Sequence, residues 1–363
     1  GFSSNPDMSN DAIDGTISAA TRNADFLARR CGNEDAALPL SNASADSDFS
    51  TKKTLKTQEE KIAFLTEIDN YIVSSFPDVV SRQVLLSCLD MEKKLQTSEG
   101  SNGHNVTTRS LIAVKLTTEN ENKEPVELSE AIGARGQYED VFESMDTIIP
   151  ALDKLYAQLL DKKEAVQPIS GYHDVILASD LAGILAHEAI GHTTEADIVR
   201  AGSVAADYLN KKVASDLITL VDFANTYEGE TLPVPIYLDD EGVESLDAVI
   251  IEDGVLKSYM HNKDSAQHFG MPLTGNARAF SYTDEPLVRM RNTAILSGSS
   301  SLDEMIASID EGYLLMRPTN GQADSTSEFM FGVQMGYEIK NGKLGKAISD
   351  TTISGVAFDM LNN

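Results

Sequence analysis

The alternation of apolar and polar residues predicts two helices near the start of the chain. Apolar residues recur at helical spacing over residues 11–30, after a polar stretch that suits a helix N-terminus. They are Ile13, Ile17, Ala20, Ala24 and Leu27. Residues 57–77 predict the second helix, because Thr57 and Glu60 form a capping-box pattern and Pro77 ends it. Residues 32–53 are polar and turn-rich, so we expect an exposed connection there.

The period of the pattern changes from about Val79. Residues 81–100 and 108–122 hold short aliphatic and β-branched runs, and "SEGSNGHN" lies between them, which predicts a long antiparallel hairpin. Cys88 is expected to be a buried residue of the first strand. A third strand is less distinct in the Glu- and Gly-rich residues 123–140. Helical periodicity returns over residues 140–166, with Pro150 as a kink or boundary.

The second half of the chain has a different pattern. "DVILAS" predicts a buried strand that leads into a helix over residues 181–200, and short strand-like segments follow. Asp253-Gly254 and Asn341-Gly342 favour type I′ hairpins. Residues 299–313 predict one further helix with a serine cap.

These patterns predict an α+β fold with two domains. Residues 1–165 are expected to form an N-terminal α+β domain, with helices packed on an antiparallel sheet. Residues 166–363 are expected to form a C-terminal β-rich domain that carries the helix over residues 181–200.

Charge and composition narrow the function. Acidic residues outnumber basic ones by 57 to 29, and the resulting net charge of −28 argues against direct binding of nucleic acid. Asp180 interrupts the longest apolar run, so we expect no membrane span and a soluble protein. The chain has only two cysteines, Cys31 and Cys88, which indicates a reducing compartment, the cytoplasm. The first residues contain neither a signal peptide nor a Met, and we expect that the natural start is missing.

The stretch "HEAIGH" carries the candidate chemistry. Histidines that share a helix face with a glutamate after the first one are typical of zinc proteases, where they lie four residues apart. His187 and His192 are five apart, which places them about 140° apart around a regular α-helix. A π-bulge, or a helix that ends at Gly191, would bring His192 back towards His187 and leave Glu188 beside the metal as a general base.

Two matters stay open on spacing alone. The histidines could be ordinary residues of a buried helix that find hydrogen-bond partners. A catalytic zinc normally takes three protein ligands, and the third could come from any of several residues, none with a decisive spacing. They are Glu195, Asp197, His173 and His261.

Several segments together resemble one family. "LAHEAIGHTTEAD", residues 238–282, "PLVRMRNTAILSG" and residues 320–355 are similar, in order and spacing, to the TldD/PmbA family of zinc metalloproteases. The likeness is to the TldD-type subunit, because the PmbA (TldE) type lacks the H-E-x-x-x-H helix. It is specific from about Gly171 to Gly355 and weaker upstream, where "GFSSNPD" resembles a point inside the family's N-terminal domain.

The resemblance implies a function, a cofactor and a partner. Family members cleave peptides and unfolded or modified polypeptides, including precursors of peptide antibiotics, and some carry an older label as modulators of DNA gyrase. By this likeness His187 and His192 are zinc ligands and Glu188 is the catalytic base. The implied assembly is a homodimer, or a heterodimer with a PmbA/TldE-type subunit, around a peptide-binding cavity.

The sequence departs from the family at the third zinc ligand. In the family this ligand is a cysteine in a Gly-rich segment after the region that matches "TTISG", and residues 356–363 contain no cysteine. We therefore expect a fragment trimmed at both ends or a protein that lacks the ligand, with zinc absent or weakly held in either case. The rival hypothesis is a non-catalytic peptide-binding or scaffold subunit.

Three arginines are further candidates. Arg278, Arg289 and Arg291 stand out in so acidic a chain. They could bind a substrate carboxylate or carbonyl, but structural salt bridges are the simpler interpretation.

Overall fold

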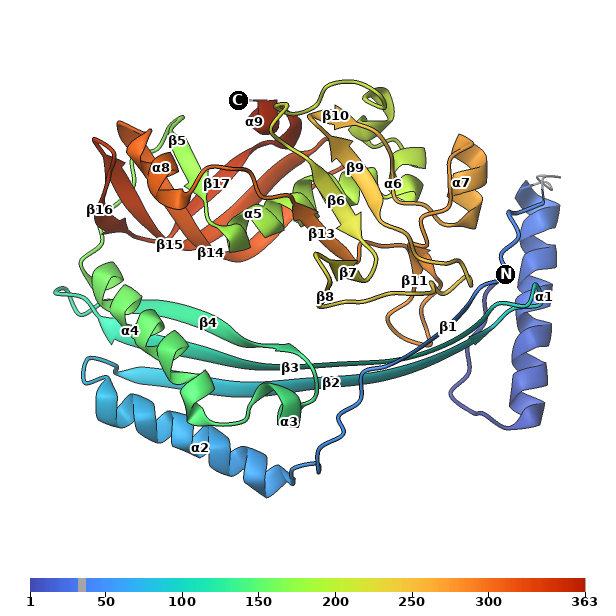
Figure 1. The fold of residues 1–363 in the computed structure, drawn as a ribbon, viewed down its shortest axis with the longest axis horizontal. Helices are drawn as coiled ribbons and strands as arrows, with labels where there is room; N and C mark the ends of the chain where they lie inside the picture. The colour runs from blue at the N-terminus through green and yellow to red at the C-terminus, as the bar shows by residue number, and fades with distance from the viewer. Residues whose placement is uncertain (32–36, 363) are drawn as a thin grey trace.

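The computed structural model describes residues 1–31 and 37–362. A long curved hairpin with helices on its outer face forms one layer, and two further sheets with short helices form the other (Figure 1). The α+β class predicted from the sequence is confirmed.

The first sheet is built on the predicted hairpin. Strands β2 (Ser81–Gln96) and β3 (Asn102–Glu119) pair antiparallel from Ser81 opposite Thr117 to Gln96 opposite Asn102. Strand β4 (Pro125–Arg135) pairs with the second half of β3, and β1 (Ser44–Asp48) runs parallel to its first half.

Strand β1 was not predicted within the exposed connection over residues 32–53, of which 32–36 lie outside the described residues. Its sequence, "SADSD", has no strand pattern of its own, and its pairing with β3 creates the strand. The predicted turn is also shorter than expected, because residues 102–105 belong to β3.

Three helices cover the outer face of this sheet. Helix α2 (Gln58–Ser75) has the predicted capping box between Thr57 and Glu60. Helix α3 (Tyr138–Val141) and a 3₁₀ turn (Met145–Thr147) precede α4 (Ile149–Lys163), so Pro150 marks a helix start and not a kink. Fully buried apolar residues join helices and sheet: Ile68, Ile72, Ile112, Val114, Leu152 and Leu155.

Helix α1 (Asn10–Cys31) forms as predicted but does not pack on the sheet. It lies beside the tip of the hairpin, and its side chains Ile17, Phe26 and Leu27 are more than half exposed (Figure 1). The expectation that Cys88 is buried is wrong, because β2 is an edge strand and Cys88 is exposed.

The C-terminal part contains two larger sheets. In one, the order β16-β15-β14-β5 joins β5 (Asp174–Leu177), β14 (Glu311–Ala323), β15 (Glu328–Lys340) and β16 (Lys343–Ile348), and β17 (Thr351–Val356) also pairs with β15. The other has the order β10-β9-β6-β13 and contains β6 (Leu220–Phe223), β9 (Ala248–Glu252), β10 (Val255–Leu256) and β13 (Asn292–Ile295). Strand β5 was predicted to be buried, but it is an edge strand in which only Ile176 is buried.

Short elements complete this part. They are β7 (Thr226–Tyr227), β8 (Glu230–Thr231), β11 (Ala277–Arg278), β12 (Leu287–Val288), the 3₁₀ helix Val204–Asp207, α7 (Lys263–Phe269), α8 (Leu302–Ala307) and α9 (Ala357–Asn362). Helix α8 has the predicted serine cap, Ser301, but ends before residue 313 because β14 begins at Glu311.

The predicted tight turns are present. Asp253 and Gly254 have φ values of 46° and 78°, and Asn341 and Gly342 have values of 50° and 73°. Positive φ at both central residues is the requirement of a type I′ turn, which Asn-Gly and Asp-Gly meet at low cost.

The two predicted domains share one apolar cluster. Met335 and Ala347 of the C-terminal part pack with the cluster of α2, α4 and the hairpin, and Lys162 of α4 forms an ion pair of 2.7 Å with Asp350. The boundary near residue 165 stays a prediction. Within the described residues, every helix is too short or too polar to cross a bilayer.

His104 links β1 to the hairpin and gives a pH-dependent prediction. Its ring nitrogens lie 3.0 Å from Asp46 of β1 and 3.1 Å from Glu92 of β2, and the bond to Asp46, followed by that to Glu92, raises the pKa of His104 above 6.5. A raised pKa in the folded state means that this stabilisation is complete below about pH 6.5 and is lost as the pH rises through the folded pKa. We expect the amides of β1 to exchange with deuterium faster at pH 8 than at pH 6, after correction for intrinsic exchange. His104→Gln should abolish the difference, and an unchanged difference in that variant would contradict the assignment.

Candidate metal centre

The "HEAIGH" stretch lies in a distorted helix between the two larger sheets. Helix α5 (Ser179–Leu185) continues as a π-helix (Ala186–Gly191), a 3₁₀ turn (His192–Thr194) and α6 (Ala196–Arg200), and it packs between β14 and β13. In a π-helix, residues five apart are hydrogen-bonded neighbours along the axis. The backbone N–H of His192 accordingly bonds to the carbonyl of His187. Of the two distortions expected from the five-residue spacing, a π-bulge or a helix that ends at Gly191, the structure has the first.

Gly191 lets the distorted helix pack closely against Met290. Its φ of −58° is ordinary for any residue, so conformational freedom is not the reason for a glycine here. A β-carbon at this position would lie 2.0 Å from the Sδ of Met290, which occupies the space. Gly191 therefore sets how closely the π-helix approaches Met290, which lies between β12 and β13.

The two histidines and Glu188 form one cluster. Ligand atoms of His187, Glu188 and His192 all lie within 4.8 Å of one another, and the imidazole centroids are 5.0 Å apart. The Nε2 of His192 lies 3.9 Å from the Glu188 carboxylate. Partial burial and then the neighbouring His192 lower the pKa of His187, which favours the neutral, metal-binding form of its ring.

Glu195 contacts the opposite side of His192. Its carboxylate, only 1% exposed, lies 3.3 Å from Nδ1 of His192, and this contact raises the pKa of His192. Because Nδ1 faces Glu195, Nε2 is the nitrogen that points into the cluster. The same carboxylate lies 3.4 Å from Arg289, and its second oxygen is buried without a hydrogen-bond partner among the described residues. Glu195 is thus placed behind His192 and outside the cluster.

The other three candidates for a third ligand also lie outside the cluster. Asp197 accepts a hydrogen bond from the backbone of Ile198. His261 is fully buried beside Ser265 and Met271, and burial lowers its pKa to about 4. His173 packs edge-on against Tyr313 in a different cavity. Within the described residues, His187, Glu188 and His192 form the one group of three side chains with metal-ligating spacing.

The cluster opens onto a cavity of about 560 Å³. Besides His187, His192 and Glu195 it is lined by residues of the 278–290 segment, among them Arg278, Phe280, Leu287 and Arg289. The space beside the two imidazoles is therefore accessible to a ligand.

The three arginines have different environments. Arg291 forms a fully buried ion pair of 2.9 Å with Asp222, and Arg289 contacts Glu195, so both confirm the structural interpretation. Arg278 differs: its guanidinium donates a hydrogen bond to the carbonyl of Met290 and forms no ion pair among the described residues, although the Asp222 and Asp240 carboxylates attract it at longer range. Asp222 and Met290 were missed in the sequence, where neither their residue types nor their spacing mark them.

The π-helix thus places two imidazoles and a carboxylate beside an open cavity, and this arrangement is a candidate metal centre.

Comparison with known proteins gives the family of this chain. Residues 170–363 match the model of the PmbA/TldA metallopeptidase C-terminal domain. A zinc metalloprotease TldD homolog of Saccharolobus solfataricus is 33% identical over 308 residues, which cover 85% of this chain and 68% of that protein. The chain belongs to the PmbA/TldD metallopeptidase family.

Two further relatives support this assignment. A metalloprotease TldD homolog of Buchnera aphidicola (subsp. Acyrthosiphon pisum) is 41% identical over 56% of this chain and 41% of its own length. The solved structure of TldE from Thermococcus kodakarensis superimposes with a TM-score of 0.72 at 17% identity, over 97% of this chain and 78% of that one, and shows the shared fold. The chain thus spans about two thirds of the first relative and less than half of the second.

The packing of Gly191 generates a prediction. Gly191→Ala should displace Met290 or straighten the π-helix, and it should destabilise the fold by about 1–3 kcal/mol, as overpacking does. Urea unfolding measures this loss. Gly183→Ala is the matched control, because a β-carbon at that helical glycine meets nothing within 4 Å. Equal stability of the two variants would rule out the packing role of Gly191.

Proposed function

We propose that the chain is a zinc-dependent peptidase subunit that hydrolyses peptide bonds in peptides or in unfolded or modified polypeptides. The observation that carries the proposal is the cluster of His187, Glu188 and His192 on a π-helix at an open cavity. The relatives are named as metalloproteases, in one case as a zinc metalloprotease, and these names support the same activity.

The residues fit a zinc ion by their chemistry. Two imidazoles whose nitrogens converge are common zinc ligands, and a carboxylate that holds the far nitrogen of one of them is the usual support. Glu195 supplies that support to His192, and Arg289 lies 3.4 Å from the same carboxylate. In this proposal His187 and His192 hold the zinc.

The chemistry divides between the metal and the chain. Zinc, when bound, supplies a Lewis acid that activates water and polarises a peptide carbonyl. Glu188, whose side chain is 26% exposed and lies 3.9 Å from His192, accepts a proton from the attacking water and passes it to the leaving amine. Glu195 fixes the orientation of His192, and Arg289 forms an ion pair with Glu195.

The assembly and location are also proposals. A TldE-like fold neighbour supports a dimer, either of two identical chains or with a PmbA/TldE-type subunit. The charge of −28 gives no physical basis for contact with nucleic acid, and the cytoplasm is the proposed compartment. The proposed organisation is an N-terminal domain over residues 1–165 and a metalloprotease domain over residues 166–363.

A second function is favoured by one observation. The cluster offers two imidazoles and the glutamate needed as a base, and a third ligand is not among the described residues around it. A non-catalytic peptide-binding or scaffold subunit would have this composition. The gene beyond the codon for Asn363 discriminates the two proposals, because a Gly-rich segment with a cysteine there would complete the site of an enzyme.

The role of Glu188 gives the central test. Glu188→Gln should lower the hydrolysis of an unfolded polypeptide by at least about 100-fold, because a general base is removed, while zinc affinity and fold are kept. Hydrolysis followed by mass spectrometry and zinc content measured by atomic absorption provide the two readouts. Retained turnover in Glu188→Gln would refute the role of this residue.

The support of His192 by Glu195 gives a separate test. Glu195→Ala should weaken zinc binding by about 10- to 100-fold, the usual effect of losing the carboxylate behind a ligating histidine. Glu195→Gln keeps an acceptor for Nδ1 and should lose less. Zinc titration against a competing chelator measures both variants, and equal affinity of parent and Glu195→Ala would contradict the geometry.

A further inference from the structure

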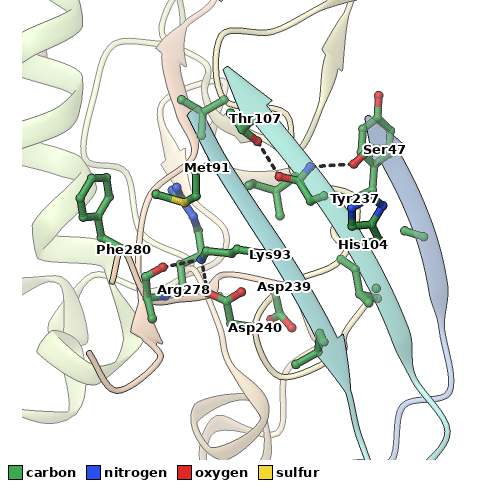
Figure 2. A pocket seen from close by; sticks show the side chains of 18 of the residues that line it. Ser47, Met91, Lys93, His104, Thr107, Tyr237, Asp239, Asp240, Arg278 and Phe280 are labelled. Carbon is green, nitrogen blue, oxygen red and sulfur yellow. Dashed lines mark hydrogen bonds and ion pairs between the residues drawn. The ribbon is translucent and has the colours of Figure 1, made fainter. Parts of the chain in front are cut away.

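A second cavity lies between the hairpin and the C-terminal part. It has a volume of about 260 Å³. Strands β1, β2 and β3 form one wall, and residues 233–240 and 278–280 form the other (Figure 2). Tyr237 and Ser47 lie towards one end of it and Phe280 towards the other. We call this cavity the hairpin pocket.

Three charged or titratable groups of the hairpin pocket, Lys93, Asp239 and His104, already have partners, whereas Arg109 and Arg278, which also line it, form no ion pair among the described residues. Lys93 bonds to Asp240 at 2.7 Å and to the carbonyl of Ala279, as the dashed lines in Figure 2 show. Asp239 accepts hydrogen bonds from the backbone of Glu241, Val243 and Ala277. His104 bonds to Asp46 and Glu92. A charged occupant would find few free partners among these groups.

The rest of the wall is mainly apolar. It includes Leu89, Met91, Leu95, Val234, Ile236 and Leu238. Because the hydrophobic effect favours removal of apolar surface from water, this lining selects an apolar occupant of side-chain size.

The hairpin pocket adjoins the candidate metal centre. Arg278, Ala279 and Phe280 line both this pocket and the cavity that contains His187 and His192. A ligand that lies along residues 278–280 can therefore reach both cavities.

Arg278 is the polar group at this junction. Its guanidinium has one hydrogen bond, to Met290, and it carries no ion pair among the described residues, so further N–H groups are available to an acceptor. A peptide carbonyl is a suitable acceptor. Arg278 thus lies where a peptide backbone would pass from one cavity to the other.

We propose that the hairpin pocket is a specificity subsite that binds an apolar side chain of a peptide lying at the candidate metal centre, with Arg278 holding a backbone carbonyl between them. Successive side chains of an extended peptide point to opposite sides, so a peptide along residues 278–280 can direct one side chain into the pocket. This inference rests on the proposed peptidase function for the identity of its ligand.

The test measures peptide binding in the Glu188→Gln background, so that hydrolysis plays no part. The probes are end-blocked, fluorescein-labelled octapeptides of Ser, Gly and Ala with a single central Leu, Ala or Lys, followed by fluorescence anisotropy. We expect the Leu peptide to bind about tenfold more tightly than the Ala or Lys peptide, as burial of a leucine side chain predicts. Equal binding of the three peptides would overturn the proposal.

Two leucines of the same strand provide a matched pair of variants. Leu89 lines the hairpin pocket, whereas Leu85 points from the same face of β2, is 56% exposed and does not line it. Leu89→Trp should fill the pocket and reduce the preference for the Leu peptide to less than about twofold, and Leu85→Trp should retain it. Retention of the preference in a folded Leu89→Trp variant would also overturn the proposal.

A second pair changes two exposed aromatic side chains. Phe280 lines both cavities and is 68% exposed, and Tyr282, 62% exposed, lines neither. Phe280→Ala should weaken binding of the Leu peptide several-fold, and Tyr282→Ala should not. If instead Leu89→Trp or Phe280→Ala changes only self-association in sedimentation velocity, the occupant is a second copy of the chain and the proposal is wrong.

Failure of this inference is distinguishable from failure of the proposed function. Loss of the binding preference with hydrolysis that still depends on Glu188 would reject the subsite alone. Hydrolysis that does not depend on Glu188, with an intact binding preference, would reject the catalytic proposal alone.

Discussion

The buried ion pair between Asp222 and Arg291 is the constraint on which the candidate centre depends. Both side chains are completely buried, and the Arg291 guanidinium also donates to the carbonyls of Thr274 and Leu246. Asp222 further accepts from Asn276. Loss of one partner of such a pair costs about 3–5 kcal/mol, because the other charge is left buried and unpaired. The network therefore fixes β6, the start of β13 and the loop before β11 relative to one another.

The position of Met290 follows from that network. As the neighbour of Arg291, it packs against Gly191, and its carbonyl accepts a hydrogen bond from Arg278. Met290 thus determines how closely the π-helix approaches and where the guanidinium of Arg278 lies. The His187–Glu188–His192 cluster and the hairpin pocket are consequently positioned by the same segment, although the pocket also draws on residues 45–109, far from the cluster in the sequence.

Neighbouring residues in the sequence were sufficient to predict helix caps, tight turns and the distorted helix. The capping box at Thr57, the I′ turns at Asp253 and Asn341 and the π-distortion at Gly191 follow from neighbouring residues. The strand β1, the exposure of Cys88 and the exposed apolar side of α1 depend on which strands lie at an edge and what covers a helix. No local pattern contains that information.

The same limit applies to the site. The motif identified His187, Glu188 and His192 as neighbours. It did not identify the side of His192 that Glu195 contacts, nor which of the three arginines lacks an ion pair.

Met335 and Ala347 pack in the same apolar cluster as α4, and this packing has a consequence for protein synthesis. A ribosome must synthesise the chain as far as Ala347 before that apolar surface is covered, and until then a chaperone would find an exposed target on the N-terminal part.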